Sequence, residues 1–179
     1  MFKTFQGVGD DHRCMTTTTA PATGTHTTDG RPHVYSSLTP FIVVTPAREA
    51  IDFYRDVFGA EVAGVTEMGG TVAHAELQFA DGRLQLGEPS DAYDLAAPSA
   101  EGPVVYSLAV YVTDVDATVD RAVSRGARVR EQPTTFVSGD RFASILDPFG
   151  VRWSVMTRVE DLSPEESDRR VADWAAQQG

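Results

Sequence analysis

The sequence lacks the features that would support a disulfide framework, a membrane span or a nucleic-acid interface. Its one cysteine, Cys14, cannot form an intramolecular disulfide, which favours a reducing compartment and predicts a cytoplasmic protein. No apolar run approaches the roughly 20 residues that a bilayer span needs. The N-terminal segment also lacks the apolar core of a signal peptide. Only 15 Lys and Arg stand against 26 Asp and Glu, giving a formal charge of −11. Such a surface repels phosphate backbones, so we expect no nucleic-acid partner, and it attracts cationic ligands.

Familiar catalytic motifs are also absent from the sequence. It contains no GxSxG elbow, phosphate-binding loop, HExxH or CxxC. Hydrophobic residues make up 41% and charged residues 23% of the 179 residues, as is ordinary for a globular protein. The length suits one domain, or two small ones that share a core.

Residues 1–35 differ from the rest of the chain. The Thr-rich stretch 16–28 offers little apolar surface to bury, so it cannot offset the entropy of ordering. We predict a disordered tail here, with Met15 as an alternative start. His12, His26 and His33 lie in or next to this tail and are given no catalytic role.

A denser pattern begins at residue 38 and occurs twice. Each copy predicts a strand, a helix and three further strands, over residues 38–89 and again over 104–157, with a linker at 90–103. The segment 58–62 matches 125–129 at an offset of 67 residues. We therefore predict an α+β fold of two βαβββ repeats spanning residues 36–158. The first repeat has its strands at 38–45, 60–67, 71–80 and 83–88, and the second at 104–113, 128–137, 141–146 and 151–157.

The last segment, 159–179, predicts a further helix. Ser163 and Glu166 form a capping box, and Pro164 suits the first helical position. Val171 and Trp174, three residues apart, would pack this helix onto the body. The alternative is a mobile acidic tail.

Several segments resemble one protein family. Residues 50–61 (AIDFYRDVFGAE), 74–77 (HAEL) and 147–154 (DPFGVRWS) are similar to segments of the glyoxalase and bleomycin-resistance proteins of the vicinal-oxygen-chelate superfamily, particularly the PhnB-like branch. The resemblance covers about residues 38–167. It implies the fold of that superfamily, one small-molecule pocket and a homodimer with pockets near the subunit interface. The family includes lyases, dioxygenases, epimerases and non-catalytic drug-binding proteins, so it does not by itself assign an activity.

The resemblance also implies four positions for a metal. Metal-dependent members carry His, Glu or Gln there, and these positions fall on Thr39, Gln85, Ser107 and Ser154 of this sequence. Three hydroxyls and one amide bring neither negative charge nor imidazole, a poor set for a divalent cation. We therefore expect no metal cofactor.

His74 and Glu76 leave a catalytic alternative open. With Gln78 they alternate along one strand and share one of its faces. If that face lines the pocket, His74 and Glu76 would bind a divalent metal or act as a base. The other interpretation is a partly solvated polar face.

Strand alternation and the carried-over positions give a predicted ligand-binding set. It is apolar and aromatic with a few neutral hydrogen-bonding groups, which suits an organic ligand with planar parts, aromatic or cationic. Core packing is the alternative for Tyr111 and Trp153. The set comprises Thr39, Phe41, His74, Glu76, Gln85, Ser107, Tyr111, Trp153 and Ser154.

Two classes of function fit this pattern. The favoured hypothesis is a metal-free protein that binds and sequesters a small natural product or antibiotic, as bleomycin-resistance proteins do. The alternative is a lyase, isomerase, dioxygenase or biosynthetic enzyme that acts on a small organic substrate, with or without a divalent metal.

Overall fold

The structure, a computed structural model, describes residues 20–99 and 102–178. Cys14, Met15 and the first four threonines of the Thr-rich stretch lie outside the described residues. The chain divides after Val34 into two parts.

A small hairpin occupies the described part of the first unit. Strands β1 (Thr27–Thr28) and β2 (Arg31–Pro32) pair antiparallel. Asp29 forms their turn at a φ of 48°, and its backbone N–H donates to the Thr23 hydroxyl at 3.1 Å. In the described residues 20–34, this hairpin differs from the disordered tail that we predicted for residues 1–35. Local hydrogen bonds between polar side chains and the backbone stabilise the turn without any apolar burial, so composition alone does not reveal it.

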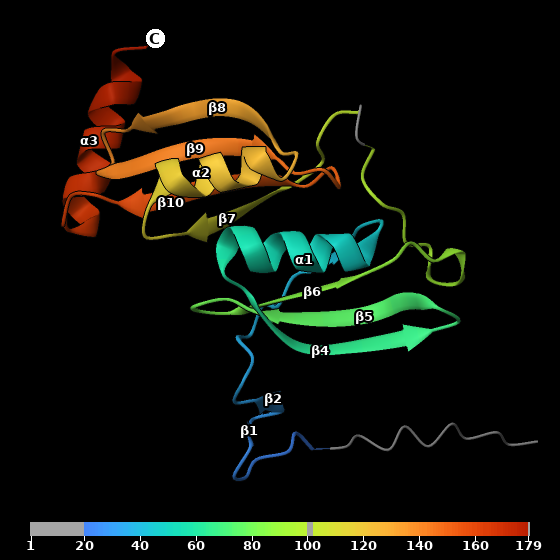
Figure 1. Cartoon of the computed structure of the whole chain (residues 1–179). Coiled ribbons are helices and arrows are strands. Elements are labelled where there is room, and N and C mark those ends of the chain that lie inside the picture. Colours follow the sequence, from blue (N-terminus) through green and yellow to red (C-terminus); the bar gives the residue numbers. More distant parts are fainter. Residues whose placement is uncertain (1–19, 100–101, 179) are drawn as a thin grey trace, which may run out of the picture. The chain divides into compact units, whose positions relative to one another are not determined.

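The second unit, from Tyr35 onward, contains the two βαβββ modules and a C-terminal helix (Figure 1). The predicted α+β fold is confirmed. The first module consists of β3 (Phe41–Val43), α1 (Ala47–Phe58), β4 (Glu61–Met68), β5 (Thr71–Gln78) and β6 (Arg83–Gly87). The linker holds a short 3-10 helix, η1 (Asp91–Tyr93). The second module consists of β7 (Ser107–Tyr111), α2 (Val115–Ser124), β8 (Arg128–Thr135), β9 (Asp140–Leu146) and β10 (Arg152–Arg158).

Each module forms one four-stranded sheet, and the two sheets have equivalent strand orders. The first runs β3-β6-β5-β4 and the second β7-β10-β9-β8. In both, the strand before the helix pairs parallel with the last strand, and the remaining pairs are antiparallel. This shared topology is the structural form of the sequence repeat.

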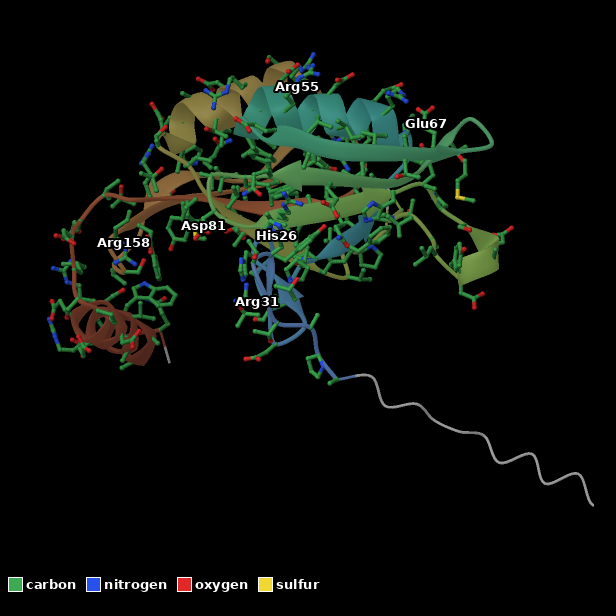
Figure 2. All side chains as sticks on the ribbon, turned by 90° about the horizontal axis from the view of Figure 1, so that it is seen from below. His26, Arg31, Arg55, Glu67, Asp81 and Arg158 are labelled. Atoms are coloured by element: carbon green, nitrogen blue, oxygen red, sulfur yellow. The ribbon has the colours of Figure 1, made fainter. Side chains whose placement is uncertain are left out.

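Helices α1 and α2 lie side by side on the same side of the sheets (Figures 1 and 2). The apolar stripe of α1 is buried, and Gly59 ends that helix at a φ of 71°, a conformation that costs glycine little. Phe58 packs on Trp153 of the second module, with ring centroids 4.6 Å apart. Arg121 of α2 donates to the Val57 carbonyl of α1 at 3.2 Å. The two modules therefore share one core.

The first strand of each module is shorter than predicted. β3 covers Phe41–Val43 where residues 38–45 were expected. Pro40 and Pro46 flank it, and a proline has no backbone N–H to extend a ladder. In the part of the chain that the structure describes, no helix is long and apolar enough to cross a bilayer.

The predicted C-terminal helix is present as α3 (Pro164–Ala176). Its Ser163 cap accepts a hydrogen bond from the Glu166 backbone N–H at 3.3 Å, as the capping box predicts.

Candidate functional site

Each sheet has one face covered by the helices and one face turned away from them, which we call the open face. On β5, Ala75 and Leu77 are fully buried on the helix side, whereas His74, Glu76 and Gln78 alternate with them and retain exposure. The predicted shared face of these three polar residues is therefore the open face of the first sheet.

Pairing across the strands gathers three predicted residues on this face. Phe41 of β3 pairs with Gln85 of β6, and Gln85 pairs with Glu76 of β5. The ring of Phe41 also stacks on that of His74, with centroids 6.0 Å apart.

Glu76 is surrounded by hydrogen-bond donors. One carboxylate oxygen accepts from the Tyr35 hydroxyl and from the Gln85 amide at 3.1 Å, and the other accepts from the Arg83 guanidinium at 2.7 Å. These donors, Tyr35 first, hold the pKa of Glu76 below its usual value, although burial opposes them. Arg83 lies over the Tyr35 ring, 4.9 Å from its centroid. Glu76 is thus a charged, satisfied carboxylate and a weak base.

His74 does not join this cluster through a described hydrogen bond. Its described neighbour is the Phe41 ring, and the hydrogen bonds of Glu76 go to Tyr35, Gln85 and Arg83. His74 therefore acts on Glu76 only as a nearby charge that helps to lower the pKa of Glu76, and among the described residues no hydrogen bond joins the two as an acid–base pair.

The open face of the second sheet carries the other predicted residues. Ser107 of β7 and Ser154 of β10 lie with their hydroxyl oxygens 3.4 Å apart. Met156 of β10 pairs with Tyr111 on one side and with Phe142 on the other. Tyr111 is 59% exposed.

A groove of about 660 Å³ lies over this second face. Apolar atoms dominate its surface, contributed mainly by two phenylalanines and a methionine. Its lining residues are Glu131, Gln132, Thr134, Phe136, Ser138, Asp140, Phe142 and Met156.

Both acids of the groove have arginine partners. Glu131 accepts from Arg152 at 2.7 Å, and Asp140 lies 2.9 Å from the Arg158 Nε. The same Arg152 donates to the Ser144 hydroxyl at 2.8 Å. The groove therefore presents an aromatic and thioether surface with neutralised charges at its edge, which suits a ligand with planar apolar parts.

Trp153 differs from its predicted place in the ligand set. It lies on the opposite face of β10 from Ser154 and is 2% exposed. Its indole N–H donates to Asp147 at 2.9 Å. Strand alternation explains the difference, because neighbouring residues point to opposite sides of a sheet. Trp153 packs in the core between the modules and also lines, with Tyr111, a separate cavity of about 470 Å³.

The side chains at the four positions implied for a metal make hydrogen bonds within the chain. Ser107 and Ser154 contact each other, the Gln85 amide donates to Glu76, and the Thr39 hydroxyl donates to the Ser36 carbonyl at 3.5 Å. Among the described residues, no three His, Cys, Asp or Glu side chains gather as a metal would require. The donor set therefore does not fit a divalent cation.

The structure adds site residues that the sequence did not single out. Tyr35 lies within the segment assigned to the tail, yet it contacts Glu76, 41 residues away. No local pattern predicts such a contact. Phe142, by contrast, alternates with Asp140 and Ser144 along β9, and the same alternation applied to that strand would have found it.

Comparison with known proteins agrees with this fold. Residues 30–155 match the family model of the Glyoxalase/Bleomycin resistance protein/Dioxygenase superfamily. The chain belongs to this superfamily. The match covers the first module and the second as far as residue 155, within β10.

The superfamily relatives of known sequence include two mycobacterial proteins. The chain is similar to the uncharacterized proteins Mb0911c of Mycobacterium bovis and Rv0887c of Mycobacterium tuberculosis, each 32% identical over 140 residues. The alignments cover 75% of this chain and 91% and 81% of those proteins, respectively.

Solved structures of similar fold include three with TM-scores near 0.55. TioX from Micromonospora sp. ML1 is 22% identical, with a TM-score of 0.54, and covers 72% of this chain and 100% of its own. A gene product from Arabidopsis thaliana is 26% identical, with a TM-score of 0.55; the match covers 68% of this chain and 98% of that protein. The fosfomycin resistance protein FosX from Listeria monocytogenes is 13% identical, with a TM-score of 0.55; the match covers 75% of this chain and 97% of that protein. At 22% and 13% identity, the likeness to TioX and FosX shows the fold alone.

Proposed function

We propose that this superfamily member binds a small organic molecule with planar apolar parts, without a resident metal, and sequesters it unchanged. The natural-product and antibiotic class of ligand fits this role. We further infer that the chain belongs to the PhnB-like branch, because its segments 50–61 and 147–154 resemble those of that branch.

The apolar groove over the second sheet carries the proposal. Phe136, Phe142 and Met156 give it aromatic and polarizable surface, and Thr134 and Ser138 add neutral hydrogen-bonding groups. A volume of about 660 Å³ lies in the range of pockets for drug-sized molecules. Recognition by such a surface depends on shape and stacking, and needs no reactive group.

The state of Glu76 supports binding over catalysis. A general base works best with a pKa near the working pH. Both oxygens of Glu76 accept hydrogen bonds, and its pKa is lowered. The alternative, a lyase, isomerase, dioxygenase or biosynthetic enzyme using His74 and Glu76, has no comparable support.

We also propose a homodimer. Large apolar side chains remain exposed on the open faces and near them, including Leu38 at 79%, Tyr111 at 59% and Phe41 at 40%. A second copy of the chain would cover such surface. Light scattering at micromolar concentration should give twice the chain mass, and a monomer at all concentrations would contradict this part of the proposal.

The test uses N-phenyl-1-naphthylamine, a neutral planar dye that fluoresces in apolar surroundings. We expect saturable binding, a loss of about tenfold or more in affinity for Phe142→Ser, and recovery of the dye unchanged. Tyr93→Ser is the matched control, because Tyr93 is an exposed linker aromatic outside the groove.

A second arm tests sequestration against turnover and metal use. Protein purified without chelator or His-tag is analysed for metals and then incubated with a natural-product library, with the bound molecules identified by mass spectrometry. We expect ligands recovered unchanged and metal far below one ion per chain. A converted product at multiple turnovers, or stoichiometric metal lost in His74→Ala, would overturn the proposal in favour of the enzyme.

A further inference from the structure

Helix α3 lies beyond the part of the chain that matches the superfamily. The family match ends at residue 155, whereas α3 spans Pro164–Ala176. Figure 2 shows this helix on the side of the second sheet that faces away from α2. That side is the open face with the groove, so α3 is placed to affect what the groove accepts.

Three contacts attach the end of β10, the segment that follows it and α3 to the turn between β8 and β9. The Ser167 hydroxyl donates to the Ser138 carbonyl at 2.9 Å, and Arg158 donates to that same carbonyl at 2.9 Å. The Val159 backbone N–H donates to the Gly139 carbonyl at 2.9 Å. Ser138 lines the groove, so the helix is fixed directly to the groove's end.

Phe136 connects the groove to helix α3. It lines the groove, and its ring meets Trp174 of α3 edge to face, with centroids 5.0 Å apart and planes at 78°. The turn holds its backbone, because the Phe136 N–H donates to Asp140 at 2.8 Å and its carbonyl accepts from Gly139 at 3.1 Å. With the backbone fixed, the aromatic partner is what orients the ring.

We propose that Trp174 is a positioning residue that holds the Phe136 ring as an aromatic wall of the groove, so that α3 selects planar aromatic ligands over aliphatic ones. This inference rests on the proposed binding function. Trp174 itself is 40% exposed and lies outside the groove lining, so it acts through Phe136.

Competition for N-phenyl-1-naphthylamine separates ligand shape from general apolarity. Naphthol and decanol serve as competitors. The Trp174→Ala substitution should weaken the affinity for naphthol by about threefold to tenfold and leave the affinity for decanol unchanged. Trp174→Phe should restore most of the naphthol affinity, because it keeps an aromatic ring. Asp168→Ala, an exposed site on the same helix, is the matched control.

A spectroscopic measurement tests the contact between Trp174 and Phe136 without a substitution at Phe136. The chain has two tryptophans, so fluorotryptophan labelling gives two fluorine NMR signals, assigned with Trp174→Phe. Naphthol should shift the Trp174 signal more than decanol does at equal saturation. Equal shifts, or none, would overturn the positioning role even if Trp174→Ala fails to fold.

The outcomes also distinguish this inference from the proposed function. If Phe142→Ser abolishes dye binding while both Trp174 variants bind naphthol as the wild type does, the groove is real and the role of α3 is wrong. If the wild-type protein binds no dye, the proposed function itself fails.

Discussion

The hydroxyl of Tyr54 on α1 donates a hydrogen bond of 2.8 Å to Asp147, which lies 93 residues later in the turn before β10. Both side chains are buried. The other oxygen of Asp147 accepts from the backbone N–H groups of Phe149 and Val151, each at 2.9 Å. Asp147 thus organises its own turn and anchors the first module to the second.

Tyr54→Phe should destabilise the fold by about 2 kcal/mol, because it removes one donor from a buried carboxylate and leaves the packing volume nearly unchanged. Urea denaturation measures the free energy of unfolding. Tyr93→Phe, at a residue 76% exposed, should change it by less than about 0.5 kcal/mol. Equal effects of the two variants would contradict the anchoring role of Tyr54.

Glu76→Gln should reduce the loss of stability in acid. The pKa of Glu76 is lowered below 4.5 in the folded protein, chiefly by the Tyr35 hydroxyl. Its stabilising contribution is therefore present above pH 4.5 and is lost as the pH falls through the folded value. The free energy of unfolding, measured from neutral pH into this acid range, should fall less in the variant than in the wild type. Parallel pH curves would contradict this assignment. Asp147, whose pKa is raised by burial, contributes the opposite slope in both proteins, so the comparison isolates Glu76.

Arg152→Met should shift ligand preference towards cations. It leaves Glu131 without its ion pair at the edge of the groove. We expect the ratio of affinities for ethidium, a planar cation, and N-phenyl-1-naphthylamine, a neutral dye, to rise about threefold. Arg55→Met, on the helix side of the sheets (Figure 2), is the control and should leave the ratio unchanged. An unchanged ratio in Arg152→Met would indicate that Glu131 does not face the ligand.

The Ser163→Ala substitution should make local opening of α3 more frequent without affecting the rest of the chain. The Ser163 side chain caps this helix, and losing such a cap costs about 1 kcal/mol. Amide hydrogen exchange should accelerate within α3 and stay unchanged in β9. Ser90→Ala is the matched control, because Ser90 precedes η1 without a side-chain capping bond. Uniform acceleration across α3 and β9 would mean that the helix does not open separately.

The architecture was predictable from the sequence because local patterns specify it. Alternation of apolar residues gives strands, helical spacing gives α1 and α2, and a repeat at an offset of 67 residues gives two modules. The open face of β5 followed from the same alternation, with His74 and Glu76 on it.

The surroundings of each site residue were not predictable in the same way. Nothing local to Glu76 indicates that Tyr35 would engage its carboxylate, and nothing near Phe136 indicates that Trp174 would meet its ring. Such contacts depend on how distant segments fold together. Trp153 illustrates a different limit, since one step along a strand moves a side chain from the ligand face to the core.

The equivalent strand order of the two sheets has a consequence for the ancestry of the chain. Arg121 lies 67 residues after Tyr54, the offset of the repeat, and each of the two reaches across to the other module: Tyr54 to Asp147 and Arg121 to the Val57 carbonyl. Two identical halves, as a tandem duplication would first produce, would have the same residue at both positions. The present halves differ at these positions, so a chain built from two copies of the first module would have the tyrosine twice and would lack the bond from Arg121 to α1.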